Sequence, residues 1–257
     1  MIAVVDIGNS NVVLGFYIGN VCSDIWRIPT IKDSSASQFY HVKLRTEILE
    51  KGLNIEDIKG CILSTVVPNL RELFQQLLAD LFEVDVVTVG PQLYEDLGFK
   101  VPRPYEIGTD LVANAYSAYH TYERDCIVAD FGTALTFTTV SGEGFVQGVA
   151  IAPGIKTAMK ALSSNTAQLP EIPLELPTSV LGQNTTHAIQ AGILWGYVGM
   201  AKELIGKIRS EVGDHYIALA TGGLSFVMEP LGDLFHKIDR NLTMNGLRLM
   251  HKHKMNK

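Results

Sequence analysis

Polar turns that follow short apolar runs hold most of the reactive potential in this sequence. The run IAVV leads into Asp6-Ile7-Gly8-Asn9-Ser10-Asn11, and the run CIVA leads into Asp130-Phe131-Gly132-Thr133-Ala134. A glycine lets the backbone turn tightly, while successive amides and polar side chains can donate to phosphate oxygens, and the aspartate can hold a cation or its water. A single turn of this type is equally typical of an ordinary hairpin. Two copies, half a chain apart, predict a nucleotide held between two lobes.

A third glycine turn, Ala220-Thr221-Gly222-Gly223, follows the apolar run from Tyr216 to Leu219. It suits the close approach of a nucleoside, although it is also compatible with a plain helix start. The sequence contains neither Gly-x-x-x-x-Gly-Lys-Ser/Thr nor Gly-x-Gly-x-x-Gly. A P-loop is therefore excluded, and a dinucleotide-binding fold has no support.

Gly108-Thr109-Asp110 precedes a stretch in which apolar residues recur at helical spacing, so Asp110 is expected at the start of a helix. An aspartate there is a good N-cap, and this structural role competes evenly with a chemical one. Asn114 stands four residues later on the same helical face, so an amide and a carboxylate point in one direction. A carboxylate so placed could accept the proton of an attacking hydroxyl group.

The elements that must position these residues alternate along the chain, which predicts an α/β fold. Strands are expected at residues 2–8, 12–21, 126–132 and 135–140, and helices around 74–81, 112–122 and 189–208, the last ending before Gly213. The unit of strand, Asp-x-Gly turn and second strand occurs twice. We therefore expect an internal duplication.

The composition excludes several classes of protein. Of the 257 residues, 47% are hydrophobic and 19% are charged, which is globular rather than disordered, and the formal net charge of −6 gives no positive field for nucleic acid or an anionic membrane. The apolar run at 192–201 is about half of the ~20 residues that span a bilayer. The N-terminus has no basic region typical of a secretory signal, and three separated cysteines predict no metal site, so we expect a cytoplasmic protein.

Seven blocks stand in one order along the chain: Asp6-Ile7-Gly8-Asn9-Ser10-Asn11, Glu106-Ile107-Gly108-Thr109-Asp110, Asp130-Phe131-Gly132-Thr133-Ala134, Ile151-Ala152-Pro153-Gly154, Thr166-Ala167-Gln168-Leu169-Pro170, Gly182-Gln183-Asn184-Thr185 and Thr221-Gly222-Gly223. Together they closely resemble the type III pantothenate kinases, which belong to the superfamily of acetate and sugar kinases, heat-shock 70 proteins and actin. The resemblance implies two ribonuclease-H-like domains, 1–115 and 116–257, related by internal duplication, with the ATP cleft between them. It also implies a homodimer whose substrate pocket lies at the subunit interface.

The same resemblance implies a role for each matching residue. Asp110 is expected as the general base toward the pantothenate hydroxyl, and Asp130 as the ligand of a potassium or ammonium ion. ATP, accompanied by Mg²⁺, is expected at Asp6, Ile7, Gly8, Asn9, Ser10, Asn11, Val12, Val13 and Thr133. Pantothenate is expected at Val101, Gly108, Thr109, Asp110, Leu111 and Thr185.

The chain departs from the family pattern at Leu111, where arginine is usual, at Val101, where tyrosine is frequent, and at Val149, where a glycine is usual. Arg103 and Lys100 are candidates to replace the missing guanidinium. Two alternatives stay open: a non-catalytic relative that senses a ligand, and a kinase of another small hydroxylated metabolite. A stripe of Ala188, Gly192, Gly196 and Gly199 permits close helix contact, within one chain or between two, and His187 either reaches the pocket or follows a capped helix start.

Overall fold

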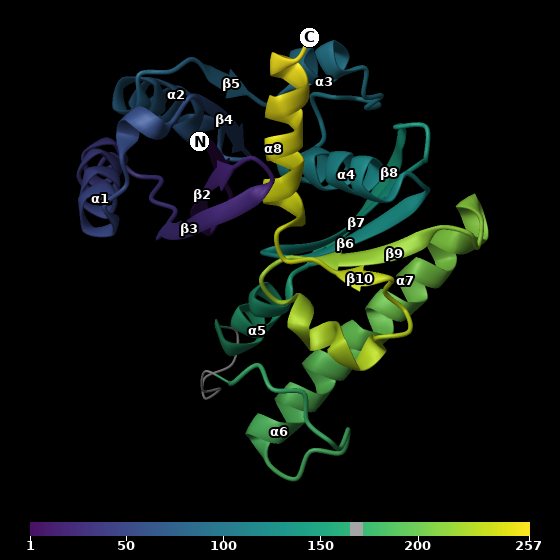
Figure 1. Ribbon diagram of the computed structural model, residues 1–257. Coiled ribbons are helices and arrows are strands. Elements are labelled where there is room, and N and C mark those ends of the chain that lie inside the picture. The colour runs from purple at the N-terminus through teal and green to yellow at the C-terminus, as the bar shows by residue number, and fades with distance from the viewer. Residues whose placement is uncertain (165–171) are drawn as a thin grey trace. The chain divides into compact units, whose positions relative to one another are not determined.

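The computed structural model describes residues 1–164 and 172–257, which form two compact units (Figure 1). The first unit comprises Met1–Ser117 together with Thr243–Lys257, and the second comprises Ala118–Leu242. The expected division between residues 115 and 116 lies close to this boundary. The expected C-terminal domain differs in one respect, because the last segment of the chain lies with the first unit. The expected block from Thr166 to Pro170 lies outside the described residues.

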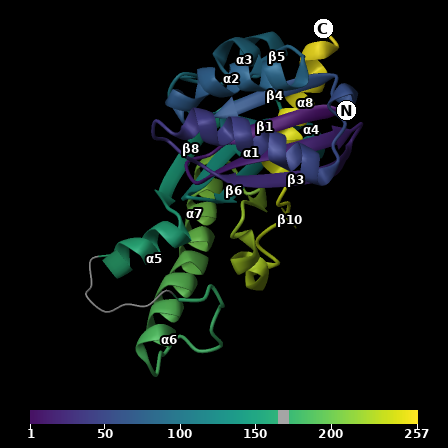
Figure 2. The ribbon, with the colours of Figure 1, turned by 90° about the vertical axis from the view of Figure 1, so that its left-hand side faces the viewer.

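A five-stranded sheet forms the centre of the first unit, with the strand order β3-β2-β1-β4-β5. The strands are β1 (Ile2–Ile7), β2 (Asn11–Ile18), β3 (Val21–Pro29), β4 (Gly60–Thr65) and β5 (Val86–Thr88). β1 runs antiparallel to β2 and parallel to β4. On one face, alternate residues such as Val5, Leu14 and Leu63 form a buried core with α1 (Ala36–Lys51) and α2 (Pro68–Phe82). Figure 2 shows these two helices in front of the strands.

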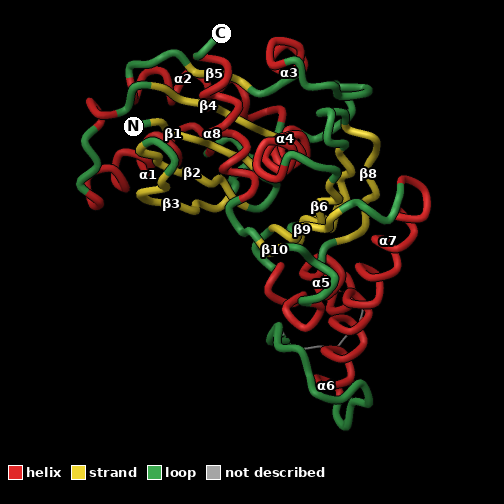
Figure 3. The backbone as a smooth tube through the Cα atoms, turned by 45° about the vertical axis from the view of Figure 1, so that its right-hand side comes forward, coloured by secondary structure: helices red, strands yellow, loops and turns green. Residues whose placement is uncertain are grey.

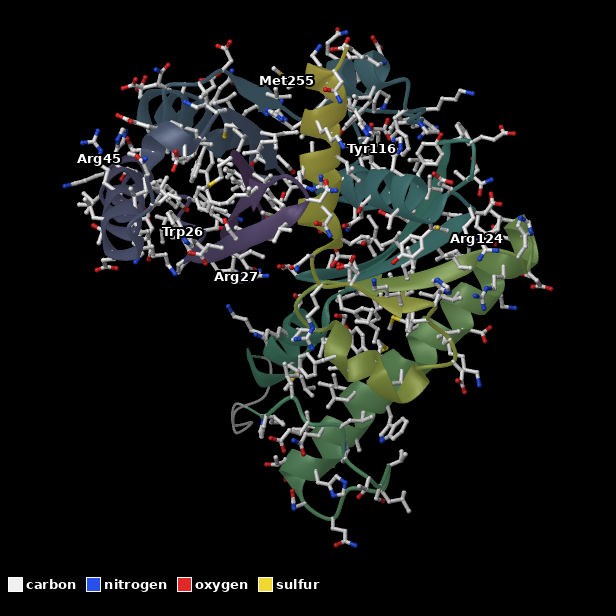
Figure 4. The ribbon with its side chains drawn as sticks, in the orientation of Figure 1. Trp26, Arg27, Arg45, Tyr116, Arg124 and Met255 are labelled. Atoms are coloured by element: carbon white, nitrogen blue, oxygen red, sulfur yellow. The ribbon has the colours of Figure 1, made fainter. Side chains whose placement is uncertain are left out.

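The other elements of the first unit include η1 (Ile55–Asp57), α3 (Pro91–Leu97), α4 (Thr109–Tyr122) and α8 (Leu242–Met255). The C-terminal helix α8 joins this unit because it packs closely on the sheet and on α4. A Cβ on Gly246 would clash with the Ala113 carbonyl, and His251 fills the space beside Gly60. Tyr116, which lies beside α8 (Figure 4), places its hydroxyl 2.6 Å from Nδ1 of His253.

The second unit repeats the topology of the first. Its sheet has the order β10-β9-β6-β7-β8, where β6 (Cys126–Phe131), β7 (Ala134–Val140), β8 (Val146–Pro153), β9 (Ile217–Thr221) and β10 (Lys237–Ile238) correspond to β1 to β5. β6 is antiparallel to β7 and parallel to β9, as β1 is to β2 and β4. The predicted α/β fold of two duplicated, ribonuclease-H-like halves is confirmed.

The helices of the second unit are α5 (Ile155–Ser164), α6 (Thr185–Gln190) and α7 (Gly196–Val212), and η3 (Ser225–Leu231) is a 3₁₀ segment. The predicted long helix is confirmed and ends before Gly213, but a π-helical turn, Ala191–Trp195, joins α6 to α7. Figure 3 shows α5 and α7 on one side of the second sheet, where residues such as Phe137 and Ile205 form the core. Within residues 1–164 and 172–257, no helix is long and apolar enough to cross a membrane.

Candidate active site

The turn between β1 and β2 forms a compact polar loop. The Gly8 amide donates to the Asn11 carbonyl at 2.9 Å, which closes the turn. Thr30, at the end of β3, braces it twice: its hydroxyl donates to the Gly8 carbonyl at 2.8 Å and its amide to the Ser10 carbonyl at 3.1 Å. Asn9, Ser10 and Asn11 are exposed at the tip, whereas Ile7 and Val12 anchor the loop in the core. This rigid loop can present amides and polar side chains to phosphate oxygens.

Lys32 supplies a positive charge to this loop. Its Nζ donates to Oδ1 of Asn9 at 2.8 Å, and the side chain is exposed. This contact is not visible in the sequence, because the two residues are 23 positions apart and meet only when β3 returns beside β2. An ammonium group here can neutralise a phosphate that docks on the loop.

Asp6, one residue from the end of β1, accepts a hydrogen bond from the Ser64 hydroxyl at 2.7 Å. Ser64 is fully buried and also lies 2.9 Å from the Thr109 hydroxyl. The parallel register of β1 and β4 places Asp6 directly beside Ser64. Sequence reasoning missed Ser64, because the surrounding residues CILSTVV are typical of a plain buried strand.

Asp110 lies in the first turn of α4, as expected, but it is a helical residue rather than the cap. Its Oδ1 accepts the Leu111 amide at 2.9 Å and lies so close to Gly108 that a Cβ on Gly108 would clash with it. Burial raises the pKa of the Asp110 carboxyl above its ordinary value, and hydrogen bonds from the Leu111 and Asp110 amides oppose the rise. The folded chain therefore holds a carboxylate whose affinity for protons is increased, which suits a base.

Tyr94 from α3 lies close enough to Asp110 for the charge of that carboxylate to affect its hydroxyl group. Its side chain is buried, and its hydroxyl has no hydrogen-bond partner among the described residues. Burial raises the pKa of Tyr94, the negative charge of Asp110 raises it further, and Arg71 lowers it. Tyr94 is a polar group near the candidate base that the sequence did not reveal.

Asn114 has a structural contact that the sequence could not show. It is completely buried, and its Oδ1 accepts a hydrogen bond from the Thr243 hydroxyl at 2.7 Å. This bond ties α4 to the start of α8. Asn114, on the same face of α4 as Asp110, therefore helps to fix the helix that carries the candidate base.

The expected pantothenate residues divide between the two units. Val101, Gly108, Thr109 and Leu111 lie in the first unit, where Thr109 and Leu111 are buried. Thr185 lies in the second unit, exposed at the start of α6. Of the candidate replacements for the family arginine, Lys100 is exposed, and Arg103 is 80% exposed with its guanidinium 3.5 Å from Glu106.

His187 follows a capped helix start. The Asn184 side chain accepts the His187 amide at 2.9 Å, and Nε2 of His187 lies 2.9 Å from the Ser179 carbonyl. The geometry matches the capping alternative for this segment.

The second expected phosphate loop follows β6. The Gly132 amide donates to the Ala134 carbonyl at 3.1 Å, and the Thr133 carbonyl accepts the Gly154 amide at 3.0 Å and the Thr157 hydroxyl at 2.7 Å. Gly222, with φ at +91°, lies against the Asp130 carboxylate and the Phe131 backbone. A side chain on Gly222 would clash with both, so glycine is required here by packing within the second unit, and the approach of a nucleoside to this turn stays a prediction.

Oxygen donors gather around Asp130. Thr136 and Thr221 are its register neighbours on β7 and β9, so all three side chains share one face of the sheet. Both threonines are buried, and their hydroxyls have no hydrogen-bond partner in the described part of the chain. A carboxylate with hydroxyl oxygens suits a hard cation such as potassium. Residues 1–164 and 172–257 contain no cluster of three or more His, Cys, Asp or Glu side chains that could hold a metal.

Two matching sheets, each with an aspartate and a glycine turn at its first strand, define the actin-like and sugar-kinase class of nucleotide-binding fold. Solved structures with this architecture include MreB 5 of Spiroplasma citri, described as bound to AMPPNP (TM-score 0.57, 11% identity, 99% of this chain and 97% of that one). Another is a Campylobacter jejuni protein provisionally described as a Baf family transcriptional activator (TM-score 0.63, 18% identity, 99% and 100%). At these identities the likeness shows the fold alone.

The family model described as "Type III pantothenate kinase" matches residues 2–207. Relatives named type III pantothenate kinase include one from Brevibacillus brevis, 37% identical with 98% of each chain covered. Another, from Treponema pallidum, is 42% identical and covers 95% of this chain and 90% of its own. The chain belongs to the type III pantothenate kinase family and is an enzyme of the phosphotransferase class.

The contact between Lys32 and Asn9 predicts a role in nucleotide affinity. Lys32→Met should raise the KM for ATP about two- to five-fold, as expected for the loss of one exposed charge interaction. The effect should shrink in high salt because counter-ions screen exposed charges. Lys43→Met is the matched control, since Lys43 is a lysine that pairs with Glu47 on α1 at 2.6 Å. Equal KM values for ATP in wild type and Lys32→Met, at low salt, would contradict the role.

Proposed function

We propose that this chain transfers the γ-phosphate of ATP to the hydroxyl group of pantothenate, giving 4′-phosphopantothenate in the first step of coenzyme A synthesis. The family match across residues 2–207 carries this proposal. The placement of a partly buried aspartate at the start of α4 supports it, because transfer to an alcohol releases a proton that a base must accept.

In this proposal the triphosphate is held by Asp6, Ile7, Gly8, Asn9, Ser10, Asn11, Val12, Val13 and Thr133. The braced turn after β1 and the bonded turn after β6 support these roles, since phosphoryl transfer depends mainly on positioning and on neutralising charge. Mg²⁺ accompanies the ATP phosphates. Asp6 and Asp130 are the carboxylates at the two turns that could reach the cation or its waters.

Pantothenate contacts Val101, Gly108, Thr109, Asp110, Leu111 and Thr185 in the proposed complex. Leu111 offers an apolar surface where a guanidinium is usual in the family, so polar parts of the substrate need another donor. Tyr94 is the better candidate for that donor within the first unit, because its hydroxyl is buried near Asp110, whereas the Arg103 guanidinium is exposed and faces Glu106.

Asp130 is the proposed ligand of a monovalent cation, K⁺ or NH₄⁺. The hydroxyls of Thr136 and Thr221 support this role, because buried oxygens without hydrogen-bond partners are costly unless something binds them. The cation would add positive charge close to the second phosphate loop.

We also propose a cytoplasmic homodimer. The stripe on α7 and the preceding turn supports self-association: Gly192, Gly196 and Gly199 are exposed, and no atom of the described residues lies within 4 Å of a Cβ placed on them. Ile151 on β8 adds an exposed apolar side chain in the same unit.

Replacement of the base tests the reaction. With pantothenate, Mg²⁺ and K⁺, Asp110→Asn should release ADP about 10²- to 10⁴-fold more slowly than wild type. Asp80→Asn, which changes an exposed carboxylate on α2, should keep the wild-type rate. A wild type that consumes no ATP with pantothenate, but does so with another hydroxylated metabolite, would show a different acceptor.

The raised pKa of Asp110 predicts how the same variant changes the pH dependence of kcat/KM and the melting temperature. The acid limb of kcat/KM for pantothenate should lie above the ordinary aspartate value of 3.8 and disappear in Asp110→Asn. A raised pKa also means that the ionised side chain destabilises the folded state at neutral pH. Asp110→Asn should therefore melt at the same temperature as wild type or higher, and a lower melting temperature would show that the charge stabilises the fold.

The cation site is tested at Thr221. Thr221→Val keeps the shape of the side chain and removes the hydroxyl, so the K⁺ concentration for half-maximal activity should rise several-fold with no loss of thermal stability. Thr138→Val is the matched control, because Thr138 is also buried and its hydroxyl has no hydrogen-bond partner in the described part of the chain, but its register partner is Val128 rather than Asp130. Identical K⁺ dependence in all three proteins would exclude Thr221 from the site.

The dimer is tested by filling the glycine stripe. Gly196→Arg should leave the monomer folded, since Gly196 has ordinary helical angles (φ −59°, ψ −44°) and arginine has the higher helix propensity. Light scattering should give a dimer mass for wild type and a monomer mass for the variant. A variant that stays dimeric with an unchanged melting temperature would place the interface elsewhere.

A further inference from the structure

A chain of hydroxyl groups links the first phosphate loop to the segment that carries the base. The Ser64 hydroxyl donates to Oδ1 of Asp6 at 2.7 Å and lies 2.9 Å from the Thr109 hydroxyl. A serine hydroxyl can donate only one hydrogen bond, and Ser64 donates it to Asp6. Thr109 must therefore donate to Ser64, so the direction of the chain is fixed from Thr109 through Ser64 to Asp6.

Three distant segments meet in this chain. Asp6 lies on β1, Ser64 on β4 and Thr109 at the first position of α4, with separations of 58 and 45 residues. Thr109 directly precedes Asp110. These hydrogen bonds thus connect a carboxylate at the phosphate loop with the helical turn that holds the candidate base.

The internal duplication provides a comparison within the same molecule. Asp130 and Thr221 hold the register positions in the second sheet that Asp6 and Ser64 hold in the first. The Thr221 hydroxyl has no hydrogen-bond partner among the described residues, whereas Ser64 has two. The sheet itself therefore does not require a bonded hydroxyl at this position. The hydrogen-bonded hydroxyl beside the aspartate is a feature of the unit that carries Asp110.

We propose that Ser64 and the Thr109 side chain are positioning residues, which hold the Asp6 carboxylate in one orientation and fix the first turn of α4 relative to the phosphate loop. This positioning role rests on the proposed function, because phosphoryl transfer requires the base and the phosphate to be held in a fixed relative position. Outer groups that orient catalytic or metal-binding carboxylates are typically worth about 10- to 100-fold in activity or metal affinity. The loss should fall on kcat, and in Ser64→Ala the KM for pantothenate should change little, because Ser64 is not one of the proposed substrate contacts.

The test combines Ser64→Ala, Thr109→Val and the double variant. Each single change should lower kcat by about 10- to 100-fold. At saturating pantothenate the double variant should be no slower than Ser64→Ala, because the effect of Thr109 on kcat passes through Ser64 and the two losses are then not additive. Thr109→Ser keeps the hydroxyl and should restore kcat. Losses that multiply in the double variant, or kcat values within about two-fold of wild type, would overturn the proposal.

Ser117→Ala is the matched control, because Ser117 is a buried hydroxyl on the same helix that has no hydrogen-bond partner in the described residues. It should match wild type in every assay. A Ser117→Ala enzyme as slow as Ser64→Ala would show that loss of any buried hydroxyl is sufficient, which would also overturn the proposal.

A second measurement does not depend on turnover. Amide hydrogen exchange of residues 106–116, without ligands, should be faster in Ser64→Ala and Thr109→Val than in wild type, Thr109→Ser or Ser117→Ala. Calorimetry should show weaker binding of Mg²⁺-ADP in Ser64→Ala, which removes the hydrogen bond from Ser64 to Asp6. If wild type fails to phosphorylate pantothenate, the proposed function fails, whereas unchanged exchange and unchanged Mg²⁺-ADP affinity in the variants would defeat the positioning role itself.

Discussion

The parallel pairing of β1 with β4 is the constraint on which the rest of the candidate site depends. It places Asp6 opposite Ser64, and because side chains alternate across a strand, both point away from the face that α1 and α2 cover. A slip of one residue would turn Asp6 into the apolar core and move Ser64 away from Thr109. The core residues Val5, Ile7 and Leu63 prevent that slip, so the packing of one face fixes the chemistry of the other.

The start of α4 shows how a folded chain can hold a carboxylate with increased proton affinity. Burial raises the pKa of Asp110, while the helix N-terminus and the Leu111 amide favour the charged form. The opposing effects leave a group that binds protons more strongly than an exposed aspartate yet keeps a defined orientation. Gly108 is required for this arrangement, because any side chain there would occupy the position of Oδ1. The helix is held in turn by the hydrogen bond between Asn114 and Thr243, so α8, from the end of the chain, supports the candidate base.

Much of the fold followed from the sequence because its signals are local. Apolar periodicity and the two Asp-x-Gly turns identified β1, β2, β6 and β7 and the duplication, and the spacing of apolar residues identified α4 and the long helix of the second unit. Contacts that depend on strand register or helix packing were not visible. Ser64, Lys32 and Tyr94 acquire their neighbours only when distant segments meet, and the placement of α8 in the first unit depends on its fit against Gly246 and Gly60. The roles of all the expected site residues, Asp6, Asp110, Asp130, Thr133 and Thr185 among them, rest on the family resemblance and stay predictions.

The duplication explains why two copies of one architecture can have different uses. Each half places an aspartate beside a hydroxyl residue at the end of its first strand: Asp6 beside Ser64, and Asp130 beside Thr221. In the first half the hydroxyl is satisfied by neighbouring protein groups, so it can transmit orientation but has little capacity left for a ligand. In the second half the hydroxyls of Thr221 and Thr136 have no protein partner among the described residues, which leaves oxygen atoms suited to a cation. The two halves thus differ in how the hydroxyl beside the aspartate is used: Ser64 is bonded to neighbouring side chains, whereas the hydroxyl of Thr221 has no partner among the described residues.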